Sequence, residues 1–152
     1  MVGYSTKIDP ENSARAIGYE LRISPKHSVE ICSKLRGMML EDAKKYLEDV
    51  IALKKAIPFK RYKKYVGHRR GKGYGPGRFP QRAAKEILRL LEHVEHNAEY
   101  GGLDTENIQI VHMSAYRGRV YQGRMPRAHG RATEWNTETV NIEIIVEEIE
   151  EQ

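Results

Sequence analysis

The chain has 152 residues, of which 39% are hydrophobic, and 26 lysines and arginines against 21 acids give it a formal net charge of +5. This length fits one domain, residues 1–152, with a modest core. The single cysteine, Cys32, excludes an internal disulfide and a cysteine-based zinc site, and it favours a reducing compartment. No apolar run approaches the ~20 residues of a membrane span, and no signal-peptide pattern opens the chain, so we expect a cytoplasmic protein.

The charge is divided between separate segments of the chain. Residues 50–85 carry twelve lysines and arginines and no acid, and residues 107–133 carry five arginines and no acid. The remaining segments are therefore acidic overall, most clearly the C-terminal tail. Two uninterrupted cationic blocks predict binding to a polyanion, with the acidic side facing solvent.

The first third of the chain predicts one strand and two helices. Alternation over residues 16–23 predicts a half-buried strand whose inward face consists of Ile17, Tyr19, Leu21 and Ile23. Ser24-Pro25 reads as an N-cap followed by a proline in the first turn, and Gly37 as the stop of this helix. A second helix is expected from Leu40, closed by Pro58. The apolar stripes of the two helices are Val29, Cys32, Leu35 and Met39, and then Leu40, Ala43, Leu47, Val50 and Ile51.

Residues 58–79 follow neither the helical nor the strand period and predict an irregular basic loop, rich in glycine and aromatic residues. Cations can pair with phosphates while rings stack on unpaired bases, a combination that suits structured RNA. The alternative is a solvated basic surface whose rings anchor the loop to the body. The candidate RNA-binding residues here are Lys60, Arg61, Lys63, Lys64, Arg69, Arg70, Lys72 and Arg78, with Arg82 just beyond the loop.

A third helix is expected from Pro80 to Gly101-Gly102, with a buried face formed by Ala84, Ile87, Leu88, Leu91, Val94 and Ala98. Two long strands follow. In the first, Ile108, Ile110 and His112 alternate with Gln109, Val111 and Met113; in the second, Val140, Ile142, Ile144 and Val146 share one face. The fold class is therefore α+β, with three helices packed on a small, three-stranded, mostly antiparallel sheet.

The first of these strands, if it runs from Ile108 to Tyr121, would extend ~45 Å at the usual rise per residue. A domain of this size has a radius of gyration of only about 15 Å. The distal half of the strand pair therefore has little core to lie on, and we expect a long protruding β-hairpin.

Residues 117–133 form the predicted tip of this hairpin. They contain no acid and carry five candidate RNA-binding guanidinium groups, those of Arg117, Arg119, Arg124, Arg127 and Arg131. Pro126 lacks a donor for a β-ladder, so Met125-Pro126 is not expected inside a regular paired strand. Gly123 and Gly130 permit turns or close approach of the backbone. The composition predicts a compact, shaped tip.

Catalytic and metal-binding motifs find little support. The glycine-rich segment 71–77 fails the phosphate-loop pattern, because its spacing from Gly67 is one residue short and Gly73 stands where Ser or Thr is required. His93 and His96 lie one helical turn apart but complete no zinc motif, and Cys32 falls on an apolar stripe. We therefore expect no enzymatic activity, no metal and no cofactor.

The segment Met125-Pro126-Arg127-Ala128-His129-Gly130-Arg131-Ala132 resembles the P-R-A-x-G-R-A hairpin motif of a universal large-subunit ribosomal protein family. This family is numbered twenty-two in bacteria and archaea and seventeen in the older eukaryotic naming. The resemblance spans nearly the whole chain and includes Ser24-Pro25-Lys26 and Lys34-Leu35-Arg36-Gly37 at the ends of the first helix, and Asn97-Ala98-Glu99. The long loop 58–79 and the acidic tail are similar to the archaeal type.

The resemblance implies a structural rRNA-binding protein of the large subunit that acts in ribosome assembly, is cytoplasmic, and is a monomer within the ribosome. Its body would lie near the peptide exit, with the hairpin tip in the wall of the exit tunnel. Its partners would be large-subunit rRNA, neighbouring ribosomal proteins and the nascent polypeptide. Arg124, Arg127 and Arg131 would contact rRNA, and the tunnel-lining residues would be Met125, Pro126, Ala128, His129 and Gly130.

Two other classes remain open at this stage. An architectural DNA-binding protein can also use a β-ribbon arm with a proline at its tip, which explains the hairpin but not the aromatic basic loop. A phosphate-handling enzyme rests only on the incomplete glycine-rich segment.

Overall fold

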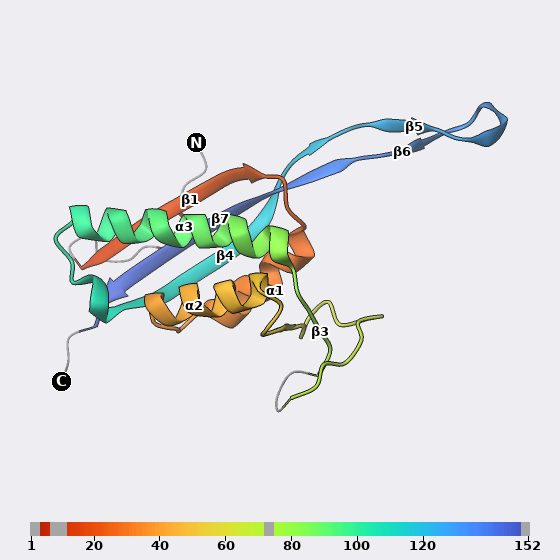
Figure 1. Ribbon diagram of the computed structural model, residues 1–152. Coiled ribbons are helices and arrows are strands. Elements are labelled where there is room, and N and C mark those ends of the chain that lie inside the picture. The colour runs from red at the N-terminus through yellow and green to blue at the C-terminus, as the bar shows by residue number, and fades with distance from the viewer. Residues whose placement is uncertain (1–3, 7–11, 72–74, 150–152) are drawn as a thin grey trace.

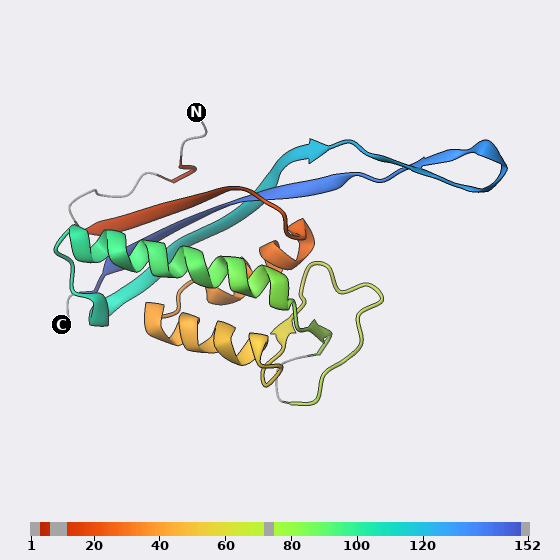
Figure 2. The ribbon, with the colours of Figure 1, turned by 45° about the horizontal axis from the view of Figure 1, so that its top comes forward.

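A three-stranded antiparallel sheet with strand order β1-β7-β4 forms the centre of the molecule, and three helices cover one of its faces (Figures 1 and 2). The computed structural model describes residues 4–6, 12–71 and 75–149. The strands are β1 (Ser13–Leu21), β4 (Ile108–Tyr121) and β7 (Thr137–Glu148), and the helices are α1 (Pro25–Leu35), α2 (Leu40–Ile51) and α3 (Gln81–Tyr100). The predicted α+β class is confirmed.

Smaller elements connect this framework. A short pair, β2 (Ile57–Pro58) and β3 (Gly77–Arg78), closes the base of the basic loop. A 3₁₀ turn, η1 (Thr105–Asn107), precedes β4. The hairpin ends in the pair β5 (Arg124–Pro126) and β6 (Ala132–Glu134), joined by the turn η2 (Ala128–Gly130).

The central strand β7 is buried on both faces. Its predicted apolar face forms part of the core, together with residues of all three helices, and consists of Val140, Ile142, Ile144 and Val146. On the opposite face Asn141 and Glu143 are also buried, although both are polar. Strand β4 supplies Ile108, Ile110 and Met113 to the core, each fully buried. The core therefore lies between the helices and one side of the sheet.

The predicted inward face of β1 is only partly correct: Ile23, just after the strand, is in the core and Leu21 packs against it, but Ile17 and Tyr19 are not buried. The buried residues are the small ones, Ala14, Ala16 and Gly18, whereas Tyr19 is 51% exposed. The reason is the close approach of α3: a Cβ placed on Gly18 would lie 2.8 Å from Cδ1 of Leu90. The helix therefore requires a strand face of small side chains, which carry a weak hydrophobic signal in the sequence.

The predicted alternation along β4 also fails beyond Ile110. The pairing register with β7 shifts between Ile110 and His112, so Val111 is an extra residue and is 38% exposed. After this bulge Met113 joins the core face and His112 the opposite face, the reverse of the prediction. An inserted residue reverses the facing of the residues that follow it, because side chains alternate with period two.

The helices begin where they were predicted to begin, but the C-terminal ends of α1 and α2 differ from the prediction. Pro25 opens α1, although Ser24 makes no side-chain capping bond, and Gly37 lies just beyond the end with φ +80°. Met39 lies outside α1, at the start of α2. Helix α2 ends at Ile51, well before Pro58. Among the described residues, no helix is both long enough and apolar enough to cross a membrane.

Candidate nucleic-acid interface

Strands β4 and β7 continue beyond the sheet as a two-stranded arm, which ends in β5, η2 and β6 and projects from the body (Figure 1). The side chains from 119 to 138 are exposed, apart from partial burial at Gly123 and Met125. Such an arm buries almost no apolar surface, so its shape comes from backbone pairing and turns. The predicted protruding hairpin is confirmed.

A cluster of buried polar groups sets the point where the arm leaves the body. The register of β4 and β7 shifts between Arg117 and Val120. Here the hydroxyl of Thr139 donates to the carbonyl of Arg119 at 2.6 Å. A Cβ on Gly118 would lie 2.6 Å from that hydroxyl oxygen and 3.0 Å from Oδ1 of Asn141. This position therefore accepts only glycine without rearrangement.

The tip is a tight, hydrogen-bonded turn. The backbone N–H of Arg127 donates to the carbonyl of Arg131 at 2.7 Å. Within η2, His129 and Gly130 have φ values of 60° and 68°, the left-handed region that a sharp reversal requires. Met125 and Pro126 belong to the three-residue strand β5, which is paired with β6 and ends at Pro126, so the proline is not in a strand interior. Proline is tolerated because it ends the strand of a two-stranded ribbon, where no further ladder partner exists.

The arm carries its five arginines along its whole length. Arg117 and Arg119 lie on β4, Arg124 on β5, and Arg127 and Arg131 flank η2, and all five are exposed. Among the described residues, the one ion pair they make joins Arg117 to Glu138, with N and O 3.6 Å apart. The guanidinium of Arg127 donates instead to the hydroxyl of Thr133 at 3.2 Å. The arm thus presents cationic groups whose charge is largely uncompensated.

The basic loop is fixed at its start by a buried carboxylate. Glu30 of α1 is 2% exposed and accepts hydrogen bonds from the backbone N–H groups of Lys60, Arg61 and Tyr62 at 3.0, 2.8 and 2.7 Å. Phe59 is buried next to these bonds, with its ring centroid 5.6 Å from that of His27. Sequence reasoning missed Glu30, because a single glutamate in an amphipathic helix usually faces solvent.

The far end of the loop is held by Arg69. Its backbone N–H donates to the carbonyl of Gly75 at 2.7 Å, its Nε donates to the carbonyl of Gly77 at 3.0 Å, and its guanidinium lies over the ring of Phe79. Arg69 was a candidate for RNA contact, and the structure gives its guanidinium a role within the loop. The candidate Lys72 lies outside the described residues.

The aromatic residues of the loop differ in burial. Phe59 anchors the loop to the body, while Tyr65 is 90% exposed. The cationic side chains of the loop that the structure describes, and Arg82 just beyond it, are at the surface. Among the described residues, no ion pair involves Lys60, Arg61, Lys63, Lys64, Arg70, Arg78 or Arg82.

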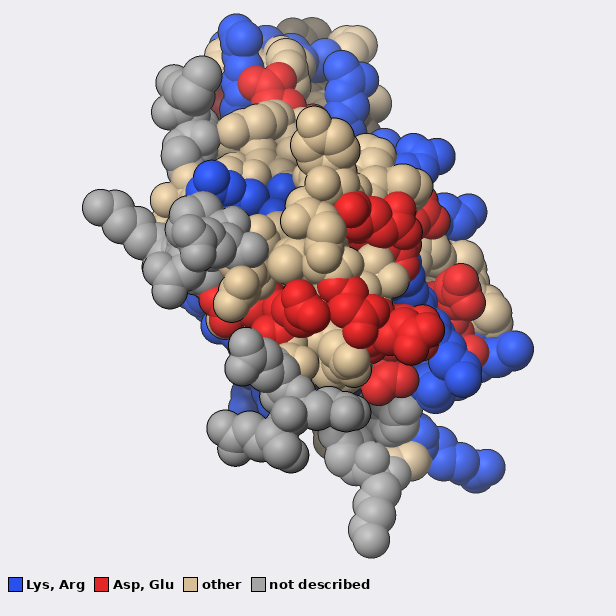
Figure 3. Space-filling view, turned by 90° about the vertical axis from the view of Figure 1, so that its left-hand side faces the viewer, with Lys and Arg blue, Asp and Glu red and all other residues tan. Residues whose placement is uncertain are grey.

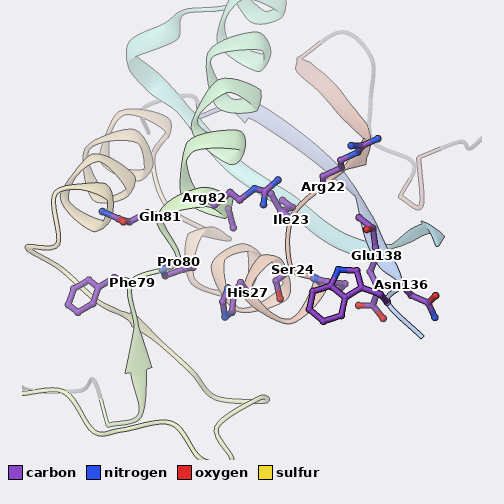
Figure 4. Close-up of a pocket in the computed structure, with 14 residues that line it drawn as sticks. Arg22, Ile23, Ser24, His27, Phe79, Pro80, Gln81, Arg82, Asn136 and Glu138 are labelled. Atoms are coloured by element: carbon purple, nitrogen blue, oxygen red, sulfur yellow. The ribbon is translucent and has the colours of Figure 1, made fainter. Parts of the chain in front are cut away.

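A groove of about 730 Å³ lies between the base of the arm and the starts of α1 and α3 (Figure 4). Arg22, Ser24, Arg82, Trp135 and Asn136 are among its lining residues. Sequence reasoning missed this groove, because its residues come from three distant parts of the chain.

A second hollow of about 380 Å³ adjoins the groove, since Ser24 and His27 line both. Its lining contains four cations and no acid, the cations being Lys26, Arg61, Lys64 and Arg78. Burial, and then the nearby guanidinium of Arg78, lower the pKa of His27. The two hollows together form a continuous surface from the arm to the basic loop.

The acidic residues gather at the other end of the body. Figure 3 shows Asp and Glu side chains across the end that faces away from the arm. The elements that finish there contribute Asp104, Glu106, Glu147 and Glu148. The charge segregation seen in the sequence is therefore also a segregation in space.

The residues with catalytic or metal-binding potential lie apart from these surfaces. Cys32 is buried in the core, and burial raises the pKa of its thiol to about 12. His93 and His96 are exposed on the polar flank of α3, as predicted. Within residues 4–6, 12–71 and 75–149, no three His, Cys, Asp or Glu side chains gather so that they could hold a metal ion.

The fold and the charge distribution define an α+β protein with a cationic projecting arm, an architecture suited to contact with a polyanion. The sequence model of the family described as "Ribosomal protein L22p/L17e" matches residues 16–147. The chain belongs to this family, as the hairpin motif predicted, and the family is not enzymatic.

Archaeal members are similar over nearly their whole length. A protein named large ribosomal subunit protein uL22 from Methanocella arvoryzae is 52% identical over 149 residues, which is 97% of each chain. Its namesake from Methanopyrus kandleri is 54% identical over 144 residues, 93% of this chain and 91% of the relative. That of Archaeoglobus fulgidus is 52% identical over 149 residues, 96% of each. The archaeal type predicted from the sequence is confirmed.

Proposed function

We propose that this chain is a structural rRNA-binding protein of the large ribosomal subunit in the cytoplasm, and that its hairpin tip forms part of the wall of the polypeptide exit tunnel. Its relatives are named as proteins of the large subunit. The observation that carries the proposal is the arm, whose exposed arginines are mostly without acidic partners among the described residues. An arm without a core gains its binding energy from a surrounding partner, and rRNA supplies the phosphates that guanidinium groups prefer.

Different residues of the tip face two different partners in this proposal, rRNA and the nascent chain. In this proposal Arg124, Arg127 and Arg131 contact rRNA and hold the tip in place. The residues between them, Met125, Pro126, Ala128, His129 and Gly130, carry no lysine, arginine or acid and leave room for a passing nascent chain. The acidic end of the body points away from the arm (Figure 3), which suits a position outside the rRNA, next to solvent or basic neighbouring proteins.

Site-specific photo-crosslinking tests both halves of the proposal. A crosslinker at Ala128 is expected to react with a stalled nascent chain, and one at Arg127 with rRNA. A crosslinker at Tyr100, which is 97% exposed at the far end of α3, serves as the control and is expected to reach neither the nascent chain nor the rRNA around the tip.

Co-sedimentation tests the location itself. The chain is expected to stay with large subunits through a high-salt wash and to be required for their efficient assembly. Recovery with DNA or free in the supernatant would contradict the proposal, and recovery with DNA would favour an architectural DNA-binding role.

A further inference from the structure

We propose that the groove at the base of the arm, together with the adjoining cationic hollow, binds a short single-stranded segment of RNA with one base stacked on Trp135. This inference rests on the proposed rRNA-binding function and assigns a second contact surface on the body, separate from the arm and its tip.

Trp135 provides the surface on which a base can stack. Its side chain is 59% exposed, lines the groove, and makes no hydrogen bond, ring contact or cation–π contact with the described residues. Its backbone is held, because its N–H donates to the carbonyl of Gly123 at 2.7 Å. An indole that is fixed at its backbone and 59% exposed suits base stacking, because every base has an aromatic face.

The walls of the groove supply charge for the phosphates. Figure 4 shows Arg22 and Arg82 on separate elements around the groove, and Ser24 and His27 lower in the view, near the start of α1. Neither arginine forms an ion pair with the described residues. The acid at this site, Glu138, is paired with Arg117 of the arm. Helices α1 and α3 also begin here, and their first N–H groups add positive potential.

The adjoining hollow continues the path away from the arm. Its four cations surround a surface without acids, and Tyr62 carries Lys26 and Arg61 at 6.0 and 5.6 Å from its ring centroid. The cations are therefore partly ordered before any ligand arrives. One strand of RNA can therefore contact both surfaces, with a base stacked on Trp135 in the groove and the following phosphates in this hollow. A duplex would present no unpaired base to the indole.

The fluorescence of Trp135 reports this contact directly, because the chain has one tryptophan. Titration of the full chain with hexaadenylate RNA is expected to quench the emission in a saturable way. An abasic ribose-phosphate oligomer of equal length carries the same charge without bases and is expected to leave the emission nearly unchanged. Equal quenching by the two probes, or binding of hexaadenylate without quenching, would overturn the proposal.

Variants separate stacking from charge, with affinity measured by the anisotropy of labelled hexaadenylate. Trp135→Leu is expected to weaken binding about ten-fold, whereas Trp135→Phe keeps a stacking ring and stays closer to the parent. Tyr100→Leu removes an aromatic ring that is even more exposed, at the far end of α3, and is the control. An unchanged affinity for Trp135→Leu would overturn the stacking contact.

The phosphate contacts have their own readout in the salt dependence of binding. Lys64→Gln and Arg78→Gln are each expected to lower the slope of log affinity against log salt by about 0.7. Lys85→Gln, an exposed cation of α3 outside both hollows, is expected to change it less. Co-sedimentation with large subunits, measured for the parent chain and the same variants, separates the two proposals. If the parent chain incorporates fully into large subunits and the variants bind hexaadenylate as the parent does, the groove proposal alone is refuted. If the parent chain does not incorporate into large subunits, the ribosomal role is refuted.

Discussion

The carboxylate of Glu30 lies 2.7 Å from the backbone nitrogen of Tyr62, and this hydrogen bond is one of three by which α1 holds the start of the basic loop. The bonds satisfy a buried carboxylate with backbone donors, so the side chains of Lys60 and Arg61 are not consumed in pairing with it. One acid thus orders a cationic segment without neutralising its cations. This arrangement explains how a loop with so many like charges keeps a defined path.

Replacing this carboxylate tests its role. In Glu30→Gln one accepting oxygen becomes a donor group, so at least one part-buried N–H loses its partner. We expect the free energy of unfolding to fall by about 1–3 kcal/mol, measured by urea titration, and cleavage by trypsin near Lys63 and Lys64 to become faster. Glu41→Gln, an exposed position on α2, is the control and is expected to change neither. Equal effects of the two variants would show that Glu30 does not anchor the loop.

The start of the arm predicts a second measurable effect. Gly118→Ala brings a Cβ to 2.6 Å from the hydroxyl oxygen of Thr139, so the strand must shift or the bond from Thr139 to Arg119 must break. We expect a loss of about 1–3 kcal/mol of unfolding free energy. Gly67→Ala is the control, because nothing lies within 4 Å of its added Cβ.

A double variant identifies the cause. Thr139→Ala removes the clashing oxygen, so Gly118→Ala is expected to cost less in the Thr139→Ala background than in the parent. Strict additivity of the two losses would contradict the steric explanation.

Glu143 predicts how stability responds to acid. Burial alone would raise the pKa of this carboxyl, but hydrogen bonds from Ser5 and from His112 outweigh burial and lower the pKa below its ordinary value of 4.5. A carboxyl with a lowered pKa in the folded state stabilises the fold above the unfolded value, and this contribution disappears as the pH falls through the lowered pKa.

The free energy of unfolding is therefore expected to decrease on acidification from ~pH 5 downwards, and Glu143→Gln is expected to flatten this decrease. Urea titrations at a series of pH values measure both slopes. Glu92→Gln, an exposed position on α3, should retain the slope of the parent. A parent-like slope in Glu143→Gln would assign the acid sensitivity to other carboxyls.

Much of this architecture follows from patterns in the sequence. The helices were predictable because each has an apolar stripe, and the arm was predictable because its strands are longer than the body and lose their apolar alternation. The charge blocks and the hairpin motif predicted a cationic, projecting tip and the family. These features are local in the chain or depend on length alone.

The errors have a common physical origin in tertiary packing. Gly18 lies on the buried face of β1 because α3 approaches closely, and a bulge at Val111 exchanges the faces of His112 and Met113. Glu30 becomes an anchor only where the loop passes over α1, and Trp135 lines a groove only once α1 and α3 lie beside it. None of these contacts is encoded in neighbouring residues.

The independence of the tip from the body is the most direct prediction for the arm. Gly123 and Trp135 are joined by a backbone hydrogen bond of 2.7 Å, so the hairpin can be closed there by a two-residue Asn-Gly turn in place of Arg124–Glu134. The β-pairs of the removed segment lie within it, and the hydrogen bond from the side chain of Asn136 to Glu134, which is lost, lies at the surface. The free energy of unfolding should therefore change by less than about 1 kcal/mol, whereas the affinity for large subunits falls.

A matched variant that keeps the tip but replaces Arg124, Arg127 and Arg131 by Gln should lose affinity for large subunits and keep the free energy of unfolding of the parent. A stability loss above about 2 kcal/mol on shortening would mean that the tip packs on the body, and unchanged incorporation of both variants would mean that the arm does not anchor the protein.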